Sequence, residues 1–165
     1  MKKAVLIFSA ALILCAAALV WWLMVTADRR AVCRLAESVA ALAHKEASNL
    51  PHAGILKFGK LDELFCEKVV IRSVKPPYDG NPTREELKLM LTAAFRRVDH
   101  MDVHTGKITA EVSGGTALFF FDAEVSGAVK GWGGEYAEVV KVSGSAVKTD
   151  GKWKVSSLIV EPVVR

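Results

Sequence analysis

The most distinctive pattern in this chain is an unbroken run of apolar and small residues near the N-terminus. Residues 4–27 carry no charge, and two lysines precede them. A helix from Ala4 to Val25 would be about 33 Å long, which matches the hydrocarbon core of a bilayer, about 30 Å thick. Trp21 and Trp22 would lie near an interface, where aromatic rings are favoured. The run from Ala4 to Ala27 therefore predicts a membrane-inserting helix.

Two fates of this helix fit the sequence. The run is longer than the core of a signal peptide, roughly 7–15 residues, which favours an uncleaved anchor over residues 1–27. The small residues at 25–27 would also permit cleavage before Asp28, which would give a secreted or periplasmic protein. We expect a retained single-pass anchor in a bacterial inner membrane, with an extracytoplasmic C-terminal domain. Three arginines that follow the run oppose this orientation under the positive-inside rule.

Beyond this run the apolar spacing becomes helical. From Asp28 to about Ser48, apolar residues recur every three or four positions and predict the first helix of a domain. These repeating positions are Val32, Leu35, Val39 and Leu42. A second helix is predicted to begin at Thr83, because Thr83 and Glu86 have the spacing of a capping box. Its apolar side consists of Leu87, Met90, Leu91, Ala94, Phe95 and Val98.

Strand patterns occupy the remainder of the chain. A β-branched run predicts a strand over 69–74, and the proline-rich residues 75–82 predict a loop. In the C-terminal third, stretches of alternating or β-rich residues are separated by turn signals, notably Gly114-Gly115 and Asp150-Gly151, of which the latter favours a type I′ turn. The predicted strands are 108–112, 116–129, 136–148 and 152–163.

Helices followed by an antiparallel meander are typical of an α+β domain with helices on one face of a sheet. Residues 28–165 have the usual length of one such domain. The mean hydropathy of +0.27 and the 52% hydrophobic content are both raised by the N-terminal run. We therefore expect one domain of ordinary composition behind the apolar segment.

Charge argues against a nucleic-acid partner. Two of the 22 basic residues precede the apolar run and all 18 acidic residues follow it, so the domain carries a formal charge of only +2. Basic and acidic residues are interleaved near the C-terminus, for example Lys141 and Lys148 with Glu138 and Asp150. Such mixing gives no basic stripe for a phosphate backbone.

Cysteine usage leaves one disulfide to consider. Cys15 lies within the apolar run, so Cys33 and Cys66 are the only pair available to an oxidising compartment. The alternative is that both are unpaired, buried thiols.

These features together resemble the nuclear transport factor 2-like superfamily, which includes SnoaL-like cyclases and ketosteroid isomerases. The resemblance covers about Asp28 to Val163 and rests on the first helix, the Thr83–Leu87 helix start, the long hairpins and the ending Val147–Val155. It implies a cystatin-like cone, in which a curved antiparallel sheet wraps around N-terminal helices and leaves a pocket. The scaffold serves enzymes, carriers and assembly modules, so it implies no single activity.

The isomerase-like members use an aspartate as general base and tyrosine or acidic donors to an oxyanion. Asp122, within an aromatic stretch, and Tyr136 are the candidates for these roles here. The first helix of this chain offers no tyrosine, which departs from that pattern. Strand alternation supplies the competing interpretation, in which Asp122 faces solvent.

Aromatic residues provide a candidate ligand-binding set. Trp132 is flanked by glycines and Tyr136 follows shortly after, an arrangement suited to a mobile lid over a pocket. Phe120, in the preceding predicted strand, is the third candidate for contact with a ligand. The alternative is a hairpin loop whose tryptophan packs on its own sheet.

A metal site is the least specific candidate. His100, Asp102 and His104 alternate, so a strand would place all three on one face as a two-histidine, one-carboxylate set. A solvated strand produces the same spacing, and no second ligand cluster supports it. We therefore expect neither a metal nor a cofactor.

The leading hypothesis is a membrane-anchored, extracytoplasmic, non-catalytic domain that binds a protein partner, a second copy of itself or a small apolar ligand. In layout alone it resembles the anchored periplasmic scaffolds of type IV secretion systems. The alternative is a SnoaL-like isomerase or cyclase that acts on a hydrophobic small molecule, with Asp122 as base and Tyr136 as donor.

Overall fold

The computed structural model describes residues 2–46, 57–131 and 134–163, without the side chains of residues 2–14, 16 and 17. Three helices and seven strands are defined in these parts. They are α1 (Lys2–Ala43), α3 (Leu61–Leu64), β1 (Phe65–Ser73), β2 (Tyr78–Gly80), α4 (Arg84–Arg97), β3 (Val98–Thr105), β4 (Thr109–Ser113), β5 (Thr116–Val129), β6 (Glu135–Thr149) and β7 (Lys152–Pro162).

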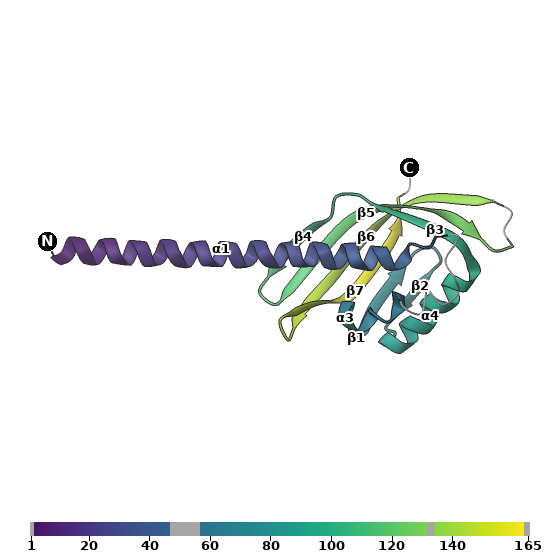
Figure 1. Ribbon diagram of the computed structural model, residues 1–165, viewed down its shortest axis with the longest axis horizontal. Helices are drawn as coiled ribbons and strands as arrows, with labels where there is room; N and C mark the ends of the chain where they lie inside the picture. The colour runs from purple at the N-terminus through teal and green to yellow at the C-terminus, as the bar shows by residue number, and fades with distance from the viewer. Residues whose placement is uncertain (1, 47–56, 132–133, 164–165) are drawn as a thin grey trace.

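Helix α1 is a single 42-residue helix rather than an anchor followed by a separate domain helix. Its second half lies along one face of the sheet, and its first half projects out of the domain (Figure 1). The residues that pack on the sheet are those of the predicted stripe together with Ala36, and all are at most 9% exposed. The pattern after Asp28 therefore identified the packed half of the helix correctly.

The strands form one curved, open sheet in the order β2-β1-β7-β6-β5-β3, and β4 also pairs with β5. All neighbours are antiparallel except β1 and β7, which are parallel. The long β5–β6 and β6–β7 ladders form the centre of the sheet. The domain is thus α+β with helices on one face, as the order of elements predicts (Figure 1).

The core lies between α1 and the sheet. Along β5, Ala117, Phe119, Phe121 and Ala123 are buried, whereas the residues between them are exposed or half-buried. Phe119 is fully buried and lies opposite Gly144 of β6, where a Cβ atom would come within 2.2 Å of the phenyl ring. A glycine at this position is therefore what allows the ring to fill the core.

The predicted start of α4 is confirmed, although Leu87 is the only residue of its predicted apolar side that is buried and Met90 is 39% exposed. Thr83 and Glu86 form a complete capping box, in which the Glu86 amide donates to the Thr83 hydroxyl and the Thr83 amide donates to the Glu86 carboxylate. Several features differ from expectation. Helix α1 ends at Ala43 rather than near Ser48, and Val98, expected on the second helix, begins strand β3, which was not predicted. Strand β1 begins at Phe65, and Tyr78–Gly80, expected within a loop, pairs with β1 as the edge strand β2. Burial of Phe65 and the β1–β7 pairing extend the strand beyond its β-branched stretch.

The two predicted hairpin turns are confirmed. Asp150 and Gly151 have φ values of 51° and 76°, the left-handed pair that a type I′ turn requires. Gly114 between β4 and β5 has a φ of 60°. Both turns lie at the end of the domain from which α1 leaves (Figure 1).

Candidate functional site

A polar cluster forms where α1 ends. Residues 44–46 run beside the edge strand β3, and Lys45 and Met101 exchange two backbone hydrogen bonds, with N–O distances of 2.7 and 2.8 Å. This short bridge places His44 opposite Asp102. Two residues far apart in sequence are therefore brought together by backbone pairing at the sheet edge.

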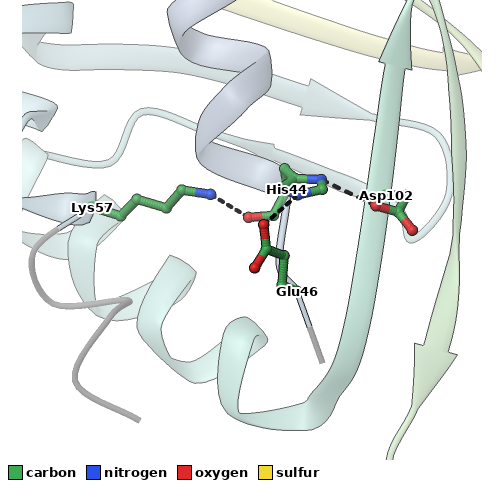
Figure 2. A network of polar contacts seen from close by, with 4 residues as sticks. All are labelled: His44, Glu46, Lys57 and Asp102. Carbon is green, nitrogen blue, oxygen red and sulfur yellow. Dashed lines mark hydrogen bonds and ion pairs between the residues drawn. The ribbon is translucent and has the colours of Figure 1, made fainter. Parts of the chain in front are cut away.

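His44 is the centre of the cluster (Figure 2). Its Nδ1 lies 3.2 Å from Oδ1 of Asp102, and its Nε2 lies 3.9 Å from Oε1 of Glu46, which is too far for a hydrogen bond. The side chains of His44 and Asp102 are 39% and 47% exposed. A carboxylate beside one ring nitrogen orients the imidazole, and the other nitrogen lies on the side of Glu46.

Two lysines border this pair. Lys57 donates to the backbone carbonyl of His44, and Lys45 donates to the carbonyls of Phe95 and Val98 at the end of α4, at 2.8 Å for Phe95. Both ammonium groups lie within 6 Å of the Phe95 ring centre, at 5.7 and 5.9 Å. Burial lowers the pKa of both lysines, and for Lys45 the charge of Lys130 lowers it further. The lysines tie α1, β3 and α4 together.

The chemistry available to this cluster is proton transfer. An imidazole held by a carboxylate is the arrangement used for general acid–base catalysis, provided that a substrate can reach the free nitrogen. The same pair can also serve only to fix the end of α1 on β3. The geometry therefore supports a candidate acid–base pair, His44 and Asp102.

A second polar contact lies at the opposite end of the packed helix. Asp28 is the point where α1 leaves the domain, and its Oδ1 accepts from Lys148 Nζ at 2.6 Å and from Trp153 Nε1 at 3.0 Å. Hydrogen bonding by Lys148 and then by Trp153 lowers the pKa of the Asp28 carboxyl. Lys148 also lies over the Trp153 ring, 5.6 Å from its centre. We call these three residues the exit clamp.

Immediately before the exit clamp, α1 exposes a continuous apolar surface. Six consecutive large side chains are between 52% and 69% exposed, namely Leu19, Val20, Trp21, Trp22, Leu23 and Met24. Much of the predicted anchor, residues 1–14, 16 and 17, lies outside the described side chains. Within the described residues, no helix combines the length and the apolar character needed to cross a membrane.

The structure does not bring the predicted catalytic residues together. Asp122 is exposed and pairs across the sheet with Lys141, whereas Tyr136 pairs with Gly127 near the far end of β5 and β6. The Tyr136 hydroxyl lies 3.5 Å from Met101 Sδ, and burial raises its pKa. Asp122 accordingly adopts the solvent-facing position that strand alternation indicated.

The predicted ligand-binding residues are also dispersed. Phe120 is half-buried on the face of β5 opposite to the core, in register with Ser143. Tyr136 is 38% exposed, and its hydroxyl contacts the sulfur of Met101 on β3. Trp132 lies outside the described residues.

The metal candidates separate as well. Asp102 contacts His44, and His100 Nε2 lies 3.8 Å from Oε1 of Glu135, whereas His104 is exposed at the end of β3. Within the parts of the chain that the structure describes, no three His, Cys, Asp or Glu side chains are grouped as metal ligands.

The candidate disulfide is not formed. Cys33 on α1 and Cys66 on β1 are both free thiols. Cys33 faces the carbonyl of Ile108 and Cys66 that of Lys154, each at 3.9 Å. Burial raises the pKa of the Cys66 thiol. The pair was predicted by elimination alone, and the fold holds Cys33 beside Ile108, just before β4, and Cys66 beside Lys154 of β7.

Sequence reasoning missed the pairing of His44 with Asp102. Asp102 was singled out with the wrong histidines, because alternation along one strand says nothing about a segment that docks at its edge. A histidine that closely follows a long amphipathic stripe was the available signal. It marks the place where a helix stops and the chain must find new partners.

Comparison with known proteins places this fold. No protein-family model matches the sequence, and no curated protein is significantly similar to it. Solved structures do match, and the shared fold is that of the nuclear transport factor 2-like proteins with a cystatin-like cone. The described part of the chain therefore has this fold, and the first half of its long helix α1 extends beyond the domain.

Three of these structures illustrate the likeness. A nuclear transport factor 2-like protein from Novosphingobium aromaticivorans is 18% identical, with 88% of each chain covered and a TM-score of 0.65. A protein from Kribbella flavida is 16% identical, covering 84% of this chain and 93% of the other, with a TM-score of 0.67. A type 2 hexachlorocyclohexane dehydrochlorinase is 15% identical, covering 84% and 87%, with a TM-score of 0.67. At these identities the likeness concerns the fold alone.

Proposed function

We propose that this protein is a membrane-held, extracytoplasmic domain of the nuclear transport factor 2-like fold that acts by binding a protein partner. One observation carries the proposal. Apolar side chains from Leu19 to Met24 are exposed on a helix that continues without a break into the domain core. Exposing these six side chains to water is unfavourable by about 25 cal/mol for each Å² of apolar surface, relative to burying them. Burial of these side chains in a bilayer would remove that cost. In the sequence, the same apolar run continues back to Ala4, which makes it long enough to enter a bilayer.

Core packing closes the face of the sheet that lies under α1. In the described residues, side chains of α1 share one core cluster with Phe119 and Phe121 of β5. Both rings are at most 5% exposed. The two rings are therefore closed to a ligand, and the proposal places recognition on the exposed surfaces of the domain.

The proposal is tested by locating the full chain in a Gram-negative host. We expect it to resist alkaline extraction from membranes, to keep its N-terminal residues, and to be cleaved by added protease only after the outer membrane is opened. A Leu12→Arg, Leu14→Arg variant should lose membrane retention, because each central arginine opposes insertion by about 3 kcal/mol.

The matched control places two arginines on exposed leucines of the domain, Leu89→Arg with Leu118→Arg, which are 69% and 47% exposed. This variant should remain in the membrane. A mature chain that starts at Asp28 would contradict the anchor in favour of a released periplasmic protein. Protease resistance in opened cells would contradict the orientation.

A second candidate function rests on the His44–Asp102 contact. The proposal here is a base-catalysed elimination from a small apolar molecule, in which His44 removes a proton from carbon, a carbon–carbon double bond forms and an anion leaves. The 3.2 Å contact between Nδ1 and the carboxylate supports this role for His44. A solved structure of similar fold is described as a hexachlorocyclohexane dehydrochlorinase.

Hexachlorocyclohexane itself is the probe for this candidate. Chloride release that disappears in His44→Gln and falls in Asp102→Asn would support elimination. His100→Gln is the control, because His100 contacts Glu135 and lies outside the pair. Equal rates in all variants, or no chloride release, would leave the binding function as the only proposal.

A further inference from the structure

The end of the domain around the exit clamp combines four basic side chains with the base of the projecting helix. Arg29 and Arg30 are exposed on α1, and Lys148 and Lys152 lie at the β6–β7 turn. We call these four residues the basic rim. Figure 1 shows that this turn lies beside α1, at the end of the domain from which the helix emerges.

The clamp fixes the position of this rim relative to the helix. Lys148 and Trp153 both donate to Asp28, so the β6–β7 hairpin is bonded directly to α1 at its point of exit. The contact also covers the carboxylate nearest to the apolar segment. The β6–β7 turn itself contains one acidic residue, Asp150, which is exposed.

The spacing along α1 places the rim at a definite depth. With a rise of 1.5 Å per residue, Arg29 and Arg30 lie about 6–7.5 Å beyond Val25, where the apolar run ends. The headgroup layer on each side of a bilayer is about 5–8 Å thick. If the run spans the hydrocarbon core, the two arginines lie among the lipid phosphates, and the clamp holds the β6–β7 turn at nearly the same level.

We propose that the basic rim binds the headgroups of anionic phospholipids and thereby seats this end of the domain on the membrane. This inference rests on the proposed anchoring. Guanidinium and ammonium groups match lipid phosphates in charge and hydrogen bonding. Trp21 and Trp22, which precede the rim on the same helix, are exposed and of the type favoured at a membrane interface. The lipid contact would orient the rest of the domain toward its partner.

The test compares the full chain in vesicles of phosphatidylcholine alone and in vesicles that also contain phosphatidylglycerol. Amide hydrogen exchange is followed at residues 148–152. We expect exchange in the anionic vesicles to be slower by at least about fivefold, the factor that one basic residue supplies near an anionic surface. The Arg29→Gln, Arg30→Gln, Lys152→Gln variant should lose this difference. It leaves the clamp residue Lys148 intact.

The control variant removes the same charge from exposed residues elsewhere, Arg96→Gln, Arg97→Gln and Lys107→Gln, and should keep the difference. Equal exchange in both vesicle types would overturn the lipid contact. Slowing by inorganic phosphate added to the neutral vesicles would also overturn it, because the rim would then be a site for free phosphate. A chain that floats with neither vesicle type would contradict the anchor itself, whereas flotation with equal exchange would contradict only the rim.

Discussion

Asp28 shows how much one side chain contributes to the placement of a helix. Its carboxylate joins α1 to two residues of the β6–β7 hairpin, and its side chain is 22% exposed. The sequence marks Asp28 only as the first charge after the apolar run. Its partners lie 120 and 125 residues further along the chain, so the contact depends on the fold.

The clamp predicts a pH-dependent loss of stability. Because the folded pKa of Asp28 is lowered, its contribution is fully present above the unfolded pKa, about 3.9, and is lost as the pH falls through the folded pKa. We expect Asp28→Asn to cost about 1 kcal/mol at neutral pH and progressively less below pH 4. Urea unfolding in detergent across this pH range measures the difference. Asp150→Asn, in the neighbouring turn, is the matched control and should have little effect at any pH.

Gly144 is a second position where one atom decides the packing. A Cβ at this site would lie 2.2–2.8 Å from three carbons of the Phe119 ring. We expect Gly144→Ala to destabilise the domain by about 1–3 kcal/mol, because the ring must leave its packed position. A combined Gly144→Ala, Phe119→Leu variant should recover part of the loss when both are compared by thermal unfolding. No recovery would show that the cost comes from the backbone of β6.

At the scale of elements, local signals predicted the helices better than the strand boundaries. The stripe on α1 and the capping box of α4 depend on residues three or four positions apart, and both are present. Strand β2 depends on pairing with β1, and β1 itself depends on β7 from the other end of the chain. The local strand propensity of residues 75–82 therefore could not predict that 78–80 pair with β1.

The capping box offers a test at this scale. Thr83→Ala removes the hydroxyl that accepts from the Glu86 amide and should cost about 1 kcal/mol of domain stability. Thr83→Ser keeps the hydroxyl and should be close to neutral. Thr92→Ala is a further control, since its hydroxyl bonds only to the Lys88 carbonyl within the same helix. Equal losses at Thr83 and Thr92 in urea unfolding would show that the box contributes nothing special.

At the scale of the whole molecule, α1 belongs to two environments. Its packed half supplies one side of the core, whereas the described large side chains of its projecting half, from Leu19 to Met24, are exposed and lie outside that core. The two halves share a helix but not a stabilising interface. This division locates the boundary between the apolar segment and the domain within a continuous helix.

Proline substitutions can separate the two halves. Val20→Pro should change domain stability by less than about 0.5 kcal/mol, because Val20 is 54% exposed and lies outside the core. Leu35→Pro should cost more than about 3 kcal/mol, because it breaks the helix and removes a buried side chain. Amide exchange of β6 and β7 in detergent measures both. A large effect of Val20→Pro on these strands would show that the projecting half supports the fold.

The sequence by itself determined the features that arise between near neighbours. These are the uncharged run from Ala4 to Ala27, the apolar stripe of α1, the capping box and the Asp150-Gly151 turn. Each depends on residues that are close together in the sequence, where hydrophobic periodicity and backbone steric preferences determine the local structure.

The tertiary structure alone decided which distant groups meet. His44 meets Asp102 because residues 44–46 dock at the edge of β3, and Asp28 meets Lys148 because the β6–β7 hairpin reaches the exit of α1. It also separated Asp122 from Tyr136 and Cys33 from Cys66. The physical reason is that such contacts depend on strand register and on the crossing of α1 over the sheet, and no short stretch of sequence encodes either.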